Sequence, residues 1–241
     1  MTRAEWDAWA DPGRMLRAAL GAGFIGRLSA LLRTRRDRAV QRKVRLYLCS
    51  CCRLLWDTVG PRGRAAVEVA ERYADGTATR AELRGAWRGA ESEALWETGA
   101  ESWWERRLNR LIPPTPWGDI DFDCDLTLHA ADARVDVGYA AELTCWRKER
   151  GQCDLLRDLF TPFGPAAIDP VWLTPAVASL AQATYAERSF PSGQLDAARL
   201  AVLADAAEEA DCADAAILSH LRGPGPHVRG CWPLDLILGK S

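Results

Sequence analysis

The sequence predicts an all-α fold, an irregular bundle of about eight or nine helices. Apolar residues recur with the period of a helix along almost the whole chain, and the connections between the expected helices are short. The composition, with 48% apolar and 27% charged residues, is typical of a globular protein rather than a disordered one. No repeat of about 20–50 residues is visible, which argues against a solenoid. The 241 residues leave room for one large domain or two small ones.

Three helices are expected before residue 60. The stretch from Glu5 to Leu20 predicts two short helices, separated at Asp11-Pro12-Gly13. The strongest helix is expected from about Asp37 to Val59, because its apolar residues fall on one helical stripe and Gly60-Pro61 ends the pattern. The stripe consists of Val40, Val44, Leu48, Cys51, Leu55 and Val59.

Further helices are expected up to about Leu111. One runs from Pro61 or Arg62 to Ala74, and Gly76 is well placed for a left-handed cap after it. Thr79 and Glu82 have the spacing of a capping box, in which each side chain bonds the backbone amide of the other residue. This capping box predicts the start of the next helix.

A proline-rich connection at residues 113–116 is the expected boundary within the chain. It separates a basic helical half, residues 1–112, from an acidic helical half, residues 117–241. Residues 1–112 carry 21 Lys and Arg against 14 Asp and Glu, whereas residues 113–241 carry 10 against 19. Opposite charge favours docking of the two halves, so we expect one compact unit.

The acidic half begins with a short extended segment near residues 119–126, because Asp and apolar residues alternate there. A long helix is expected from about Leu128 to Phe160, with a kink near Gly138 or Gly151. Thr174-Pro175 is a typical helix start. The remaining expected elements are helices over about 196–210 and 213–221, a rigid turn at 223–226 and an apolar segment at 232–238.

The chain is expected to be cytoplasmic. Its first residues are charged and lack an apolar core, so they do not resemble a secretory signal. The longest uncharged run, residues 170–186, contains two prolines and several polar residues, so no membrane span is expected. In that compartment the eight cysteines are expected to be reduced thiols, most of them buried.

Several motifs resemble an uncharacterised family that is abundant in planctomycete bacteria. They are Cys51-Cys52-Arg53, Cys153-Asp154-Leu155-Leu156-Arg157-Asp158, Asp169-Pro170-Val171-Trp172-Leu173-Thr174 and Gly225-Pro226-His227-Val228-Arg229-Gly230-Cys231-Trp232. The loop after Phe160 departs from the family pattern, so its contacts are not carried over. The resemblance implies no activity.

A metal site is one candidate function. Cys212, His220, His227 and Cys231 lie within 20 residues, and zinc is bound by four such nitrogen and sulfur ligands. Cys49 and Cys52 are alternative ligands, since their spacing places them on one face of a helix. The competing interpretation is that these cysteines are buried and that His227 bonds a backbone carbonyl. No other cofactor is expected.

Catalysis and nucleic-acid binding are weaker candidates. A Cys231–His227 nucleophile pair lacks the distant partner segment and the elbow motif that such sites need, so no catalytic residue is predicted. Acidic residues near 119–132 lack the glycine of a calcium loop. Residues 27–64 carry 11 Lys and Arg and two Asp, which could contact phosphates, but no recognised nucleic-acid motif accompanies them.

The leading prediction is a non-catalytic interaction or regulatory module that binds a protein partner or a second copy of itself. A zinc-supported domain around His227 and Cys231, structural or catalytic, and an arginine-rich nucleic-acid-binding protein are the alternatives. The residues expected to make interactions are Arg38, Arg42, Arg45, Arg229, Trp232 and Asp235.

Overall fold

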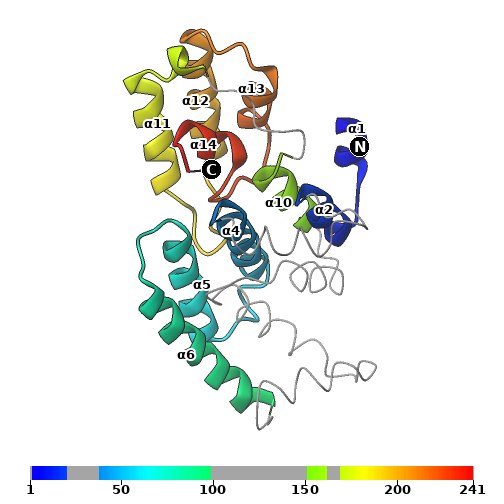
Figure 1. Cartoon of the computed structure of the whole chain (residues 1–241), viewed down its shortest axis with the longest axis vertical. Coiled ribbons are helices and arrows are strands. Elements are labelled where there is room, and N and C mark those ends of the chain that lie inside the picture. The colour runs from blue at the N-terminus through cyan, green and yellow to red at the C-terminus, as the bar shows by residue number, and fades with distance from the viewer. Residues whose placement is uncertain (1, 21–37, 99–150, 162–168, 241) are drawn as a thin grey trace. The chain divides into compact units, whose positions relative to one another are not determined.

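A computed structural model describes residues 2–20, 38–98, 151–161 and 169–240, and of residues 93–98 it describes the backbone alone. These residues form ten α-helices and one short 3-10 helix, and they contain no strand beyond isolated bridges (Figure 1). The all-α prediction is therefore confirmed. The chain divides into two compact units. The first unit contains Met1–Ala30 and Arg147–Ser241, and the second contains Leu31–Trp146.

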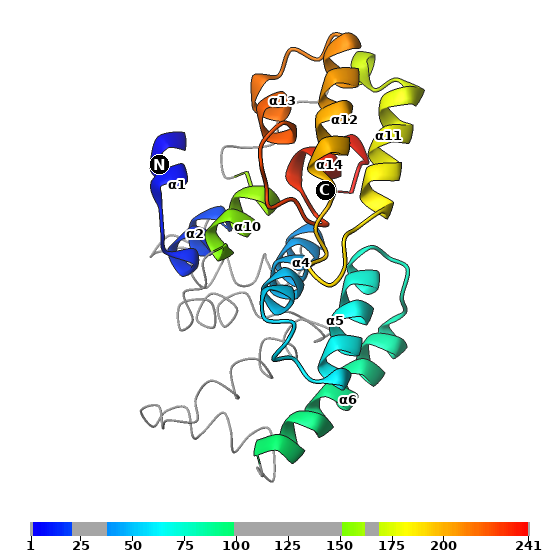
Figure 2. The ribbon, with the colours of Figure 1, turned by 180° about the vertical axis from the view of Figure 1, so that it is seen from behind.

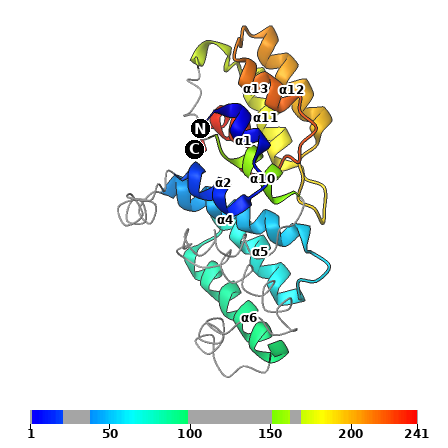
Figure 3. The ribbon, with the colours of Figure 1, turned by 90° about the vertical axis from the view of Figure 1, so that its right-hand side faces the viewer.

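The second unit contains three described helices: α4 (Arg38–Leu54), α5 (Pro61–Ala74) and α6 (Arg80–Thr98). Helix α5 packs against both α4 and α6 (Figure 3). The predicted apolar stripe of α4 is buried from Val44 through Leu48 to Cys51. The buried ion pair between Arg53 and Glu71, with Nε and Oε1 2.6 Å apart, also joins α4 to α5.

Helix α4 ends five residues before the predicted end at Val59. Residues after Leu54 form turns in which the side chains of Thr58 and Arg64 bond backbone carbonyls. Pro61 disfavours helical backbone at Gly60, which is extended and begins α5. The apolar pattern continues through these turns because Leu55 and Val59 are still buried.

The connection from α5 to α6 follows the sequence prediction. Gly76 has a φ of 73°, which is the left-handed conformation expected after a helix. The backbone nitrogen of Thr79 donates to Glu82, and that of Glu82 donates to the Thr79 hydroxyl, so the capping box is present.

The first unit brings together the two ends of the chain. Its elements are α1 (Arg3–Ala8), α2 (Pro12–Ala19), α10 (Gln152–Leu159), η1 (Pro170–Trp172), α11 (Pro175–Ala186), α12 (Ala197–Glu209), α13 (Ala215–Leu221) and α14 (Trp232–Ile237). Helix α12 lies between α11 and α13, and α14 packs against α11 and α13 (Figures 1 and 2). A shared apolar core joins these last four helices.

Helix starts in this unit agree closely with the sequence. Thr174 caps α11, with Pro175 at the first helical position. Asp196 and Asp214 cap α12 and α13 through bonds to backbone amides. These caps fix where each helix begins, which is why local sequence was sufficient to place them.

The N-terminal helices pack with α10. Helix α2 contacts α10, and Arg157 Nη2 donates to the carbonyls of Asp7 and Trp9 at 2.8 and 2.7 Å. This grouping differs from the predicted halves 1–112 and 117–241, because the apolar faces of α1 and α2 are buried beside a segment from the other end of the chain. The predicted boundary at 113–116 and the extended segment near 119–126 lie outside the described residues.

The long helix predicted over 128–160 begins only at Gln152 in the described residues. Gly151 has a φ of 107°, and a right-handed helix cannot continue through that backbone conformation. Residues 128–150 lie outside the described part. No helix in the described ranges has the length and apolar character needed to cross a membrane.

Candidate metal centre

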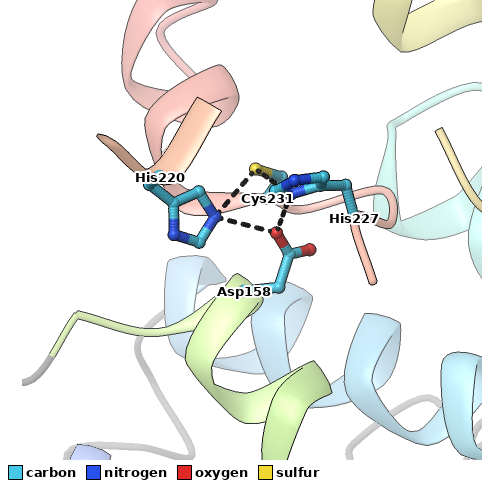
Figure 4. Close-up of side chains that lie close together, drawn as sticks. All are labelled: Asp158, His220, His227 and Cys231. Atoms are coloured by element: carbon cyan, nitrogen blue, oxygen red, sulfur yellow. Dashed lines mark hydrogen bonds and ion pairs between the residues drawn. The ribbon is translucent and has the colours of Figure 1, made fainter. Parts of the chain in front are cut away.

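Four side chains with metal-binding atoms converge in the first unit: Asp158, His220, His227 and Cys231. One atom from each lies within 4.8 Å of the others (Figure 4). Asp158 comes from α10, His220 from α13, and the other two from the segment that leads into α14. The centre therefore joins three segments that are separate in the sequence.

Helix periodicity places Asp158 toward the interior. Leu155, Leu156 and Leu159 form the buried face of α10, and Asp158 lies one turn after Leu155 on that face. Its side chain is 2% exposed. A carboxylate in that position needs polar partners, because burying an unpaired charge is costly.

The turn before α14 places His227. Gly225 has a φ of 81°, and a Cβ on this residue would lie 2.8 Å from the backbone nitrogen of His227. The backbone therefore requires glycine at this position. The carbonyl of His227 accepts from Leu195, and Val228 forms a bridge with Gln194, so the segment is also tied to the loop before α12.

Asp158 is the common partner of both histidines. Its Oδ1 lies 2.9 Å from Nε2 of His220 and 2.9 Å from Nδ1 of His227. Its Oδ2 accepts from the backbone nitrogen of Val228 at 2.8 Å. Cys231 Sγ lies 3.5 Å from His220 Nε2 and 3.9 Å from His227 Nδ1.

Within the centre, burial and pairing have opposite effects on the pKa values of Asp158 and His227. Burial alone raises the pKa of Asp158, but the hydrogen bonds and charges of His220 and His227 hold it below its ordinary value. Burial alone lowers the pKa of His227, yet its bonds to Asp158 and to the Gly223 carbonyl raise it above the ordinary value. Pairing therefore favours an ionised Asp158 and a protonated His227.

The partners of His227 define its proton positions. Nε2 lies 3.1 Å from the Gly223 carbonyl oxygen, which can only accept, so Nε2 carries a proton. Nδ1 faces Asp158. This orientation suits a doubly protonated ring that donates to Asp158, and it equally suits a neutral ring that presents its Nδ1 lone pair to a metal. Metal-bound histidines commonly donate their second nitrogen to a backbone carbonyl in this way.

The partners of His220 differ. The indole Nε1 of Trp232 is a donor only, and it lies 3.1 Å from His220 Nδ1. Nδ1 therefore accepts, and the proton of the neutral ring lies on Nε2, which donates to Asp158. The side chain of His220 is 14% exposed, whereas those of Asp158 and His227 are 2% and 3% exposed.

The donor set fits zinc. Ligand atoms around a tetrahedral zinc ion lie about 3.3–3.7 Å apart, given metal–ligand distances of about 2.0–2.3 Å. Two observed separations, both 2.9 Å, are shorter than that range, one of 3.5 Å lies within it, and one of 3.9 Å is longer. One thiol, two imidazoles and one carboxylate are all established zinc ligands.

The arrangement does not match a cysteine–histidine–aspartate catalytic relay. In such a relay the acid bonds one ring nitrogen while the other nitrogen faces the nucleophile. Here Asp158 and Cys231 both approach Nε2 of His220. The Cys231 residue is fully buried, so a substrate cannot reach its sulfur without rearrangement.

Three of the four predicted ligands, His220, His227 and Cys231, come together, and the fourth does not. Cys212 lies before α13 and His220 near its end, so most of the helix lies between them. Cys212 instead packs in the apolar core. Cys49 and Cys52, the alternative ligands, lie buried on α4 in the second unit.

Asp158 was missed by the sequence prediction. Its signal was an acidic residue on the apolar face of an amphipathic helix, where an acid needs a buried partner. The long-range pairing of α10 with the segment before α14 cannot be inferred from the local pattern.

The predicted interaction residues have mixed environments. Arg38 is exposed, Arg42 pairs with Asp75 at 3.2 Å, and Arg45 is buried. Arg229 is half-buried, with its guanidinium 5.5 Å from the Tyr185 ring centre. Trp232 and Asp235 are buried. Burial places Arg45, Trp232 and Asp235 inside their units rather than on the surface, and the interaction role of the six residues stays a prediction.

The fold and the centre together describe an all-α protein with a buried Asp/His/His/Cys group. No family model, curated protein or solved structure matches this chain. The resemblance to the planctomycete family therefore stays a prediction, and the functional argument depends on the geometry of the centre.

Proposed function

We propose that this chain is a non-catalytic, cytoplasmic helical module whose first unit binds one zinc ion through Asp158, His220, His227 and Cys231. The convergence of four ligand atoms from three separate segments carries this proposal. A polar group of this kind in an otherwise apolar core is costly unless its members are paired or bind a cation.

Zinc is favoured over calcium and magnesium by the donor set. A thiolate excludes the hard cations calcium and magnesium, which prefer oxygen ligands. When His220 is bound, two imidazoles, one carboxylate and the thiolate form a four-coordinate set without a water molecule. A closed set of four protein ligands is typical of structural zinc, so the proposed ion stabilises the fold rather than activates a substrate.

The proposed ion would fasten α10, α13 and the start of α14 to one another. Free energy of metal binding then becomes free energy of folding, because the unfolded chain does not hold the ligands together. A fold maintained in this way presents its surface to a protein partner or to a second copy of the chain, which is the function we propose for the module.

Nucleic-acid binding has less support. The arginines that suggested it include Arg45, which is buried, and Arg42, which forms an ion pair with Asp75. Charges in these environments are not available to phosphates.

The test is the zinc content of the untagged protein, measured by elemental mass spectrometry. We expect about one zinc per chain. Asp158→Asn, His227→Ala and Cys231→Ser should each lower the zinc content strongly. Cys212→Ser is the matched control, since it removes a buried thiol of the same unit that is outside the centre.

Two results would contradict the proposal. One is native protein without zinc after purification and after incubation with zinc. The other is zinc that is lost in Cys212→Ser and retained in Cys231→Ser, which would place the metal elsewhere.

A further inference from the structure

We infer that His220 is the exchangeable ligand of this centre, and that Trp232 regulates zinc binding by holding His220 in the tautomer that cannot bind the metal. This inference depends on the proposed zinc site. The observation behind it is the bond from the Trp232 indole nitrogen to His220 Nδ1, at 3.1 Å.

The argument starts from the proton count of a neutral imidazole. The ring carries one proton, and Trp232 donates to Nδ1, so that proton lies on Nε2. Nε2 is the atom that faces Asp158 and Cys231, and it is therefore the atom that must bind the metal (Figure 4). A nitrogen that carries a proton has no lone pair for a metal.

Zinc binding through Nε2 therefore requires the ring proton to move to Nδ1. The N–H of Trp232 would then face the N–H of His220, and two donors cannot bond each other. The Trp232–His220 bond and the His220–zinc bond exclude one another. His227 has no such conflict, because its second nitrogen donates to the carbonyl of Gly223.

The environment of His220 agrees with this role. His220 is the most exposed of the four ligands, and its ring packs edge-on against the Trp232 ring, with centroids 5.3 Å apart. Asp158, His227 and Cys231 then form a set of three retained ligands. The fourth position of the ion changes between His220 and a small ligand from solvent, such as water.

The consequence is a zinc site whose affinity is set by an indole hydrogen bond at the first position of α14. Occupancy of the fourth position is coupled to the orientation of Trp232, and so to the packing of α14. The two coordination states differ in the hydrogen bond of Trp232, at the start of α14. A change in zinc coordination can therefore shift the population of α14 conformations, which suits a regulatory module.

The first experiment compares zinc affinity by competition with a chromophoric chelator. Trp232→Phe removes the indole N–H and keeps an aromatic ring, so we expect zinc to bind about two- to tenfold more tightly. Trp172→Phe is the matched control, because Trp172 is buried to a similar extent, 5% exposed against 6%, in the same core. We expect zinc to bind to this control with native affinity.

The second experiment reads the tautomer directly by nitrogen NMR of the histidine rings. The chain has three histidines, so the spectrum is simple. In chelator we expect the His220 proton on Nε2, and with zinc we expect it on Nδ1 together with a shifted Trp232 indole signal. This measurement separates a regulatory bond from a merely structural one, since loss of packing alone would not move the proton.

The outcomes distinguish the inference from the proposed function. If the native protein binds no zinc, both fail. If the native protein binds zinc through the four ligands while Trp232→Phe binds with equal or lower affinity, the inference alone is overturned. A His220 proton that stays on Nε2 in all of the zinc-bound protein also overturns the inference, because His220 then never occupies the fourth position of the ion.

Discussion

At the scale of single residues, Gly225 has little tolerance for a side chain. Its φ is 81°, and an added Cβ would lie 2.8 Å from the backbone nitrogen of His227. Relief of that contact must move His227, which holds both Asp158 and the Gly223 carbonyl. The turn is thus part of the centre although glycine contributes no ligand.

We therefore expect Gly225→Ala to lose zinc and to lower the free energy of unfolding by more than the cost of a left-handed alanine, about 1–2 kcal/mol. Gly239→Ala is the control, because Gly239 also has a positive φ, 62°, but an added Cβ there meets nothing within 4 Å. Urea unfolding and zinc content of both variants check this. Equal effects of the two substitutions would show that the turn does not position His227.

The Asp158–His227 pair predicts a pH dependence of the protein kept in chelator. The pKa of Asp158 is lowered from 3.8, so its stabilising contribution is present above that value and is lost as pH falls through the lowered pKa. The pKa of His227 is raised from 6.5, so its contribution is present below that value and is lost as pH rises through the raised pKa. The pair is fully stabilising between 3.8 and 6.5.

Stability in chelator should therefore fall as pH rises above 6.5 and through the raised pKa of His227. With zinc the slope should reverse, because binding displaces the Nδ1 proton of His227 and is favoured at higher pH. Urea unfolding of native protein and of Asp158→Asn, each with and without zinc, measures the difference due to the pair. A native protein that has the same pH slope as Asp158→Asn would refute the expectation.

Three of the four residues of the candidate site were predicted from the sequence. His220, His227 and Cys231 were found because they are close in sequence and the turn between them brings them together. Cys212 was wrongly included because the distance along a chain does not give the distance in space once a helix intervenes. Asp158 could not be placed as a ligand, since its partners are 62 and 69 residues away.

At the scale of elements, helix α10 has two neighbouring residues with separate roles. Asp158 faces the candidate metal centre, while Arg157 donates to the carbonyls of Asp7, in the last turn of α1, and of Trp9, which follows α1. A single short helix therefore holds the N-terminal helices and the segment before α14.

We expect Arg157→Met to loosen α1 and α2 while the zinc content stays at the native level. Loss of charge-assisted bonds to two carbonyls should cost about 1–3 kcal/mol, seen as faster amide hydrogen exchange over residues 3–19. Arg199→Met is the control, since Arg199 is an exposed arginine of α12 that pairs with Glu187. Unchanged exchange in Arg157→Met would show that apolar packing alone holds these helices.

The starts of helices could be predicted from local sequence more accurately than the residues at which helices end. The caps at Thr79 and Thr174 could be predicted from the sequence because each depends on residues within one turn. The end of α4 could not be predicted in this way, because buried apolar residues continue at helical spacing through the turns after Leu54. Residues in a turn that face the core are apolar for the same reason as residues in a helix, so apolar spacing alone does not show where a helix ends.

At the scale of the whole molecule, the all-α class followed from periodicity and composition, whereas the grouping of helices did not. Charge separated the chain at residues 113–116, but the contacts of α2 with α10 assign the N-terminal helices to the first unit. Pairing across such a long stretch of chain depends on apolar faces that fit, and one sequence does not show which faces meet.

The first unit includes residues from both ends of the chain, and the ribosome makes those ends at different times. Helices α1 and α2 are synthesised before the second unit, but their partner α10 ends at Leu159, after all of Leu31–Trp146 has been made. The second unit therefore has the opportunity to fold during translation before the first unit can close. Trp6, Met15 and Leu16 are buried in the folded protein. Until α10 has been synthesised, these apolar side chains lack the helix against which they pack.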